Sequence, residues 1–383
     1  MKRDRIIIYF AGFLASIPIA LMSYINSSFL SPFIGERFVG LVYTLGSLVS
    51  ILMLLFAPRV FRKIGGHRFL LLVIGLNTLS ILWLALSTNA FSAVCSFVLG
   101  FALNIVVFFS LDELLKIFSK ESATGRIRGI YLALSNFAWV VAQLLSGTVF
   151  GNFPLKTIYI IAFFIMILFF LLSLFGLKNI PDPKYDRLKI LSYVKDFIKN
   201  KNLLRSYSID FLLQFFYCWM IIYTPIYLYS YLGFTWKDIA IIFTIMLLPF
   251  VLIESSMGRY SDKVGERKML MVGFFIISIS TISLFFIQKP EIWIWAALLF
   301  LTRVGAATVE VMSDSYFFKH IKPENEEFVG IYRSTSPLAY ITGPIVALMV
   351  FIFLPKFNFI FPVLGLMMLF GVYLASTIRK ADI

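Results

Sequence analysis

The chain has 383 residues, of which 60% are hydrophobic and only 14% are charged. Soluble domains carry about 25% charged residues, and this chain repeats apolar runs of about 18 residues or more, long enough to cross a membrane as a helix. The composition excludes a soluble protein, and the long runs exclude a transmembrane β-barrel, whose strands would give short alternating segments.

Taken in chain order, the apolar runs predict an all-α membrane protein with twelve transmembrane helices. The first run is expected to be a retained helix, because it is too long for a signal peptide and lacks a small-residue cleavage site. The approximate bounds of the predicted spans are 6–30, 38–57, 69–88, 91–115, 127–150, 157–177, 206–231, 236–256, 269–288, 292–318, 329–354 and 357–378.

The formal charge of +14 is explained by topology and does not indicate a nucleic-acid partner. With a cytoplasmic N-terminus, 27 of the 34 Lys and Arg residues lie on the cytoplasmic side and five on the other side. The positive-inside rule therefore predicts that both termini are cytoplasmic. We expect a multi-pass protein of the plasma (cytoplasmic) membrane, which is the inner membrane where a cell has two.

A polar stretch divides the spans six and six, and it predicts three parts: an N-terminal bundle (1–177), a cytoplasmic linker (178–205) and a C-terminal bundle (206–383). The linker is predicted to contain an amphipathic helix, which either lies on the anionic leaflet or is a solvated connection. Its apolar residues recur at helical spacing among lysines: Leu188, Leu191, Val194 and Ile198.

Two pairs of segments repeat between the halves. RVFRKIGGHR (59–68) matches RYSDKVGERK (259–268), and GIYLALSNFAW (129–139) matches GIYRSTSPLAY (330–340). The offsets, 200 and 201 residues, are nearly equal. Such a repeat is typical of a duplicated six-helix unit, in which the charged segment connects the second and third helices of each half.

The charged segment of the second half carries the pattern G-x-x-x-D-[RK]-x-G-x-[RK]-[RK]. With this pattern, the twelve spans and the central bridge, the chain resembles the major facilitator superfamily over essentially its whole length. The resemblance implies two pseudo-symmetric six-helix bundles, a cavity lined by spans 1, 4, 7 and 10, and a cytoplasmic latch. The pattern is met by Gly258, Asp262, Lys263, Gly265, Arg267 and Lys268.

Two further residues are predicted at this latch or gate. Glu254 closes the eighth span beside the charged segment, and Arg333 lies near the cytoplasmic end of the eleventh span, where it could pair with Asp314 or Glu310. The first half departs from the pattern, with Pro58 and Arg62 at its Gly and Asp positions.

The tenth span carries the densest set of ionisable residues. Arg303, Glu310 and Asp314 are spaced i, i+7 and i+11 and therefore share one helical face. Charges are costly in a membrane, so each is a candidate functional residue. Arg303 either holds an anionic or polar substrate group or pairs with a carboxylate, with Glu310 exchanging a proton; the alternative is a fixed salt bridge. Asp314 is a candidate second proton carrier or gate residue.

Neutral polar and aromatic side chains mark the other predicted cavity helices. In the seventh span Asp210, Gln214 and Tyr217 share a face, and Asp210 is a candidate either for proton binding or for a gate. The alternatives for the remaining residues are hydrogen bonding between helices and packing. Besides Arg303, the candidate substrate-binding residues, in the first, fourth, fifth and seventh spans, are Tyr24, Asn26, Asn104, Asn136, Trp139, Gln143, Gln214 and Tyr217.

No residue set indicates an enzyme, a metal site or a cofactor, since the chain has two Cys and two His and no nucleotide-binding or hydrolase motif. We predict a monomeric secondary active transporter that moves a small amphipathic or anionic organic molecule with protons, and we favour efflux. An uptake symporter or facilitator for a sugar-like or amino-acid-like solute is the alternative. A non-transporting sensor or lipid-handling protein with this fold is the alternative of another class.

Overall fold

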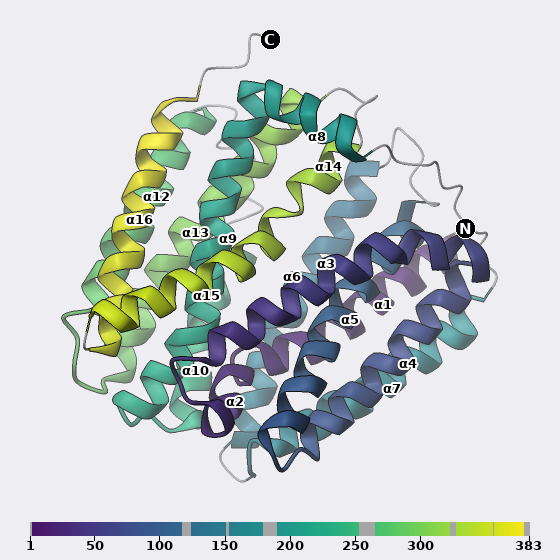
Figure 1. Cartoon of the computed structure of the whole chain (residues 1–383), viewed down its shortest axis with the longest axis horizontal. Helices are drawn as coiled ribbons and strands as arrows, with labels where there is room; N and C mark the ends of the chain where they lie inside the picture. The colour runs from purple at the N-terminus through teal and green to yellow at the C-terminus, as the bar shows by residue number, and fades with distance from the viewer. Residues whose placement is uncertain are drawn as a thin grey trace. The chain divides into compact units, whose positions relative to one another are not determined.

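The computed structural model describes residues 2–116, 124–150, 153–178, 190–252, 265–321, 327–354 and 356–378. All regular elements in these ranges are helical (Figure 1). Within the described ranges, ten helices are long and apolar enough to cross a membrane. The other two predicted spans correspond to α6 (Thr124–Phe150), with a shorter apolar part, and to α10 (Trp236–Leu252). The predicted all-α membrane fold is confirmed.

The chain forms two compact units, Met1–Asp186 and Arg187–Ile383. In the first unit α1 packs against α6 and α7, and α4 packs against α5 and α7 (Figure 1). Besides α6, its helices are α1 (Lys2–Ser23), α2 (Asn26–Ile34), α3 (Val39–Ile64), α4 (Gly66–Ala85), α5 (Ala90–Lys116) and α7 (Lys156–Gly176).

In the second unit α13 packs against α9, α10 and α12, while α15 and α16 also contact α9. A π-helical turn, Tyr227–Tyr231, extends α9, and a 3-10 turn, Phe357–Phe359, precedes α16. Besides α10, the helices are α8 (Ile190–Lys199), α9 (Lys201–Ile226), α12 (Glu266–Leu284), α13 (Ile292–His320), α14 (Glu327–Tyr332), α15 (Thr335–Phe353) and α16 (Ile360–Ser376).

Two predicted spans are broken into two helices each. The first is interrupted after Ser23, and the eleventh is interrupted at Arg333 and Ser334. The second break has a local cause, because Pro337 has no N–H to donate and its ring would clash with the carbonyl of Arg333 one turn earlier. The corresponding position of the repeated segment is Asn136, and there α6 continues without a break.

The repeated charged segment is largely helical, whereas the sequence predicted a longer connection. α3 runs on through Arg62 and Lys63, and Gly65 alone separates it from α4. Gly65 has φ 85° and ψ 151°, and Gly265, just before α12, has φ 85° and ψ 143°. Side chains essentially exclude this backbone conformation, so glycine is required at both turns.

Two glycines set the orientation of α13. A Cβ on Gly305 would lie 2.6 Å from the carbonyl oxygen of Gly273, so α12 and α13 are in backbone contact there. Gly305 lies two residues after Arg303, which places the two on roughly opposite faces of the helix. The close approach to α12 therefore directs the face of Arg303 away from α12 and toward α9.

The linker helix α8 packs within the second unit. Phe197, which is 1% exposed, joins a cluster with Leu203, Phe317, Phe328 and Tyr332. The neighbouring Ile198 stays 55% exposed. Phe197 therefore attaches α8 to α9, α13 and α14.

Candidate functional site

Arg303 is buried against two aromatic rings of α9. Its side chain is 1% exposed, and its Cζ lies 5.2 Å from the ring centroids of both Phe216 and Tyr217. The two rings are consecutive residues, so they project about 100° apart and enclose the guanidinium from two sides. Among the described residues, neither Nε nor Nη1 of Arg303 has a hydrogen-bond partner.

The two aromatic rings do not by themselves compensate the charge of Arg303. Burying an ion costs several kcal/mol even after relaxation of the protein. A desolvated cation–π contact returns about 2 kcal/mol, and the donors on Nε and Nη1 remain unsatisfied, which costs about 1–3 kcal/mol more for each nitrogen. An anion beside the guanidinium would supply both an opposite charge and acceptors for these N–H groups.

Glu310 lies two turns further along α13 than Arg303, and both residues contact Tyr217. The hydroxyl of Tyr217 donates to Oε2 of Glu310 at 2.7 Å. Tyr217 therefore contacts the guanidinium with its ring and the carboxylate with its hydroxyl. The structure brings together three of the residues that the sequence singled out, and Gln214, half-buried, lies one turn from Tyr217 on α9.

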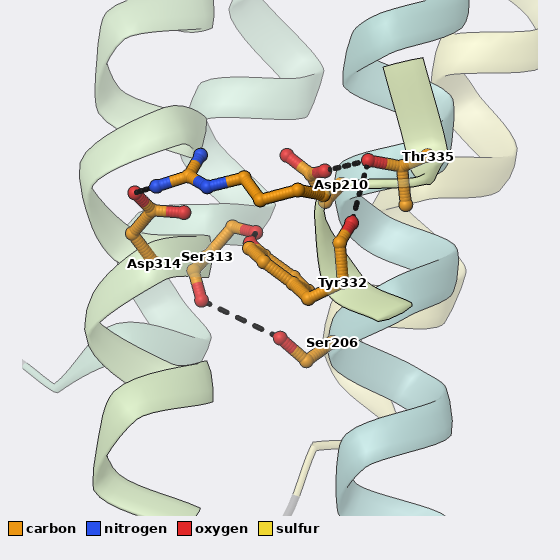
Figure 2. Close-up of polar contacts among 7 residues, drawn as sticks. Ser206, Asp210, Ser313, Asp314, Tyr332 and Thr335 are labelled. Atoms are coloured by element: carbon orange, nitrogen blue, oxygen red, sulfur yellow. Dashed lines mark hydrogen bonds and ion pairs between the residues drawn. The ribbon is translucent and has the colours of Figure 1, made fainter. Parts of the chain in front are cut away.

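A hydrogen-bond network surrounds the break between α14 and α15 (Figure 2). The hydroxyl of Thr335 donates to Oδ2 of Asp210, which is 4% exposed, and also lies 2.9 Å from the carbonyl oxygen of Tyr332. Tyr332 in turn hydrogen-bonds Ser313 at 2.6 Å, and Ser206 donates to the Ser313 carbonyl at 3.5 Å. Asp210 thus ties α9 to the start of α15.

Arg333 forms an ion pair with Asp314. Its Nη2 lies 3.4 Å from Oδ2, and the two side chains are 52% and 29% exposed. The Arg333 Cζ also lies 5.9 Å from the ring centroid of Tyr332. Exposed ion pairs contribute about 0–1 kcal/mol, so this pair is weak enough to break and re-form.

The first unit contains a small cavity of about 30 Å³, lined by both polar and apolar side chains. Asn26 and Asn104, which the sequence predicted to bind substrate, line it together with Ser80 and Ser96. Asn26 accepts from the hydroxyl of Tyr159 at 2.9 Å, and Asn104 accepts from the Asn77 amide at 2.6 Å. A water molecule needs roughly 10–15 Å³ by this measure, so the cavity has room for about two waters and none for an organic substrate.

The other predicted residues of the first unit make contacts between helices. Gln143 is 3% exposed and donates to the carbonyl of Ala20 at 3.1 Å, in the last turn of α1 where helical donors run out. Trp139 packs edge-on against Tyr24 at 6.2 Å, and Asn136 is half-buried on the same side of α6. The contact of Gln143 is therefore a hydrogen bond between two helices, the alternative to substrate binding.

Several predicted latch residues lie outside the described residues: Glu254, Gly258, Asp262 and Lys263. Of the others, Gly265 makes the turn before α12, and Arg267 and Lys268 are exposed on its first turn. Their neighbour Glu266 accepts an ion pair from Lys319 of α13 at 2.5 Å. Within the described ranges, no group of three or more His, Cys, Asp or Glu side chains could hold a metal ion.

Sequence reasoning missed the partners of the predicted residues. Thr335, Tyr332 and Ser313 sit around Asp210, and Phe216 covers Arg303. The repeat GIYRSTSPLAY offered a sequence signal for Thr335, which lies two residues before Pro337, the proline at the helix break. The stacking of Phe216 had none, because 43 Phe residues make any single one uninformative.

The helical units and their buried charges are those of a multi-pass membrane transporter. The model of the Major Facilitator Superfamily matches residues 6–253 and 211–382. The chain belongs to this superfamily and is therefore a transporter of that type, not an enzyme. No curated protein sequence matches the chain.

Solved structures share the fold at low sequence identity. An auto-inhibited peptide transporter of the POT family superposes with a TM-score of 0.79 at 11% identity, covering 99% of this chain and 98% of its own. For a mutant of the nucleoside transporter NupG the values are 0.76, 12%, 97% and 98%. For the human organic anion transporter MFSD10 (TETRAN) they are 0.69, 14%, 98% and 99%.

Proposed function

We propose that this transporter moves small organic anions, with Arg303 holding the anionic group and Glu310 exchanging a proton. The observation that carries the proposal is the buried guanidinium whose Nε and Nη1 have no partner among the described residues. A substrate carboxylate that accepts hydrogen bonds from these nitrogens would make a charge-assisted contact.

The surroundings of Arg303 favour an amphipathic anion. Phe216 and Tyr217 flank the guanidinium, and Phe250 of α10 packs edge-on against Tyr217 at 6.2 Å. These rings suit an aromatic or otherwise apolar body next to the anionic group. A sugar would need many hydroxyl partners, so the apolar neighbourhood argues against the sugar-like alternative at this site.

The proposal is tested by a ligand screen with the purified full chain in detergent. Matched pairs of an organic carboxylate and its neutral amide, such as phenylacetate and phenylacetamide, are compared by thermal unfolding. A ligand that binds the folded state raises the free energy of unfolding by mass action, by about 2.7 kcal/mol at 100 times its Kd. We expect stabilisation by carboxylates and not by their amides.

Two variants make the screen specific. Arg303→Ala should remove the stabilisation, and Arg37→Ala, which changes an exposed arginine of the first unit, should keep it. Stabilisation that is equal for acid and amide, or that survives Arg303→Ala, would refute the assigned anion site. A chain that binds ligand but never transports it would point to the sensor alternative.

A further inference from the structure

Resting on the proposed function, we infer that Tyr217 couples anion binding at Arg303 to protonation of Glu310. The inference starts from its position: one side chain of α9 contacts both groups, the guanidinium through its ring at 5.2 Å and the Glu310 carboxylate through its hydroxyl at 2.7 Å.

The first step is steric. The Nε and Nη1 atoms of Arg303 are buried, so an anion reaches them when a covering side chain moves. Phe216 is buried on α9, whereas Tyr217 is half-buried and so has more room to move. A carboxylate that binds the Arg303 guanidinium therefore displaces the Tyr217 ring and, with it, the hydroxyl that donates to Glu310.

The second step is electrostatic. A hydrogen bond donated to a carboxylate favours its ionised form, and so does a nearby cation. An anion that displaces Tyr217 and neutralises Arg303 removes both influences at once. Glu310 then binds a proton from water, and the bound anion and bound proton stabilise each other's presence. Coupling of this sign produces symport of an anion with a proton, which argues against the efflux that the sequence favoured.

Other charged groups around Glu310 set the background for this step. Asp314 and Arg303 act on it from α13, Asp210 from α9 and Arg333 from the break before α15. Asp314 and Arg333 are paired with each other, so their effects largely offset. On α12 Glu266 is paired with Lys319, which follows Glu310 by nine residues on α13. On α10 Lys237 and Asp238 lie in the first turn.

The test measures phenylacetate affinity by calorimetry for the detergent-solubilised full chain, at about pH 8 and about pH 6, where the probe itself stays ionised. Allosteric coupling is reciprocal and typically amounts to about 5- to 150-fold. We expect wild-type affinity to rise within that range from the higher to the lower pH. Glu310→Gln, which cannot take up a proton, should bind with the same affinity at both.

Tyr217→Phe is the decisive variant, because it keeps the ring over Arg303 and deletes the hydroxyl. A hydrogen bond to a charged group changes an equilibrium by about tenfold or more, so the pH effect should shrink by about that factor while binding persists. The direct attraction between Arg303 and Glu310 should account for the part of the pH effect that remains in this variant. Tyr207→Phe on the same helix, whose hydroxyl contacts Ser334 at 3.1 Å, is the matched control and should behave as wild type.

The outcomes separate the two proposals. Binding that is retained in Tyr217→Phe with the wild-type pH effect overturns the role of Tyr217 and leaves the anion site intact. Wild-type binding with no pH effect has the same consequence. Absence of phenylacetate binding in wild type overturns the proposed anion site and the coupling with it.

Discussion

Thr335 stabilises the carboxylate of Asp210, which is 4% exposed. It donates to Asp210, and the same hydroxyl lies within hydrogen-bond distance of the carbonyl of Tyr332, so one side chain serves both sides of the helix break. The sequence singled out Asp210 and left a gate role and a proton role open. The structure shows that Thr335 holds the carboxylate. The sequence could not show this, because the two residues lie 125 positions apart and no local pattern connects them.

Thr335→Val therefore should destabilise the protein. The substitution keeps the side-chain shape but leaves a buried carboxylate without its donor, which costs about 1–3 kcal/mol. Thermal unfolding in detergent measures the effect. Thr342→Val, which removes a hydroxyl bonded to the Leu338 carbonyl on the same helix, should cost clearly less. Equal losses in the two variants would contradict the special role of Thr335.

Residue spacing predicted part of the site and not its partners. Arg303, Glu310 and Asp314 were predicted to share a face from helical periodicity, which follows from the backbone alone. Which helix faces them depends on packing, here on the Gly273–Gly305 contact that directs α13 toward α9. The sequence left open whether Arg303 pairs with a carboxylate. Instead Glu310 is bonded to Tyr217, and Asp314 is paired with Arg333.

At the scale of elements, the two glycine turns are the clearest trace of the duplication. Gly65 and Gly265 stand 200 positions apart and share φ 85°. The sequence matched the segments around them but predicted connections about ten residues long, since charged residues suggest loops. The structure continues α3 through those charges, because lysine and arginine are good helix formers and one glycine suffices to reverse the chain.

Gly265→Ala should cost about 1–3 kcal/mol of stability through backbone strain alone. A Cβ at Gly265 would meet nothing within 4 Å, so crowding plays no part. Gly330→Ala is the matched control, because its Cβ also meets nothing within 4 Å and its φ is not positive. Thermal unfolding of both variants decides the matter, and a Gly265→Ala protein as stable as Gly330→Ala would refute the strain.

The linker helix offers a second test at this scale. Phe197 anchors α8 in the aromatic cluster with Phe317 and Tyr332. Phe197→Ala should lower the local stability of α8 and α14 by about 3–5 kcal/mol, while Ile198→Ala, at an exposed site, should not. Hydrogen exchange over 190–199 and 327–332 reports the change. Unaltered exchange in Phe197→Ala would mean that α8 is held by other contacts.

For the whole molecule, apolar periodicity predicted the fold because lipid leaves few alternatives. A bilayer forces each crossing segment to satisfy its own backbone hydrogen bonds, so long apolar runs become helices whatever their detailed sequence. This explains how structures 11–14% identical to the chain share its fold. The substrate does not follow from that constraint, because a fold can carry many sites.

Counterflow in proteoliposomes tests the central claim most directly, since it requires both an anion site and its alternating exposure. Vesicles loaded with phenylacetate and diluted into the labelled compound should accumulate label when they contain wild type or Arg37→Ala. Vesicles with Arg303→Ala should show no accumulation above protein-free vesicles. Equal counterflow by Arg303→Ala and wild type would contradict the account.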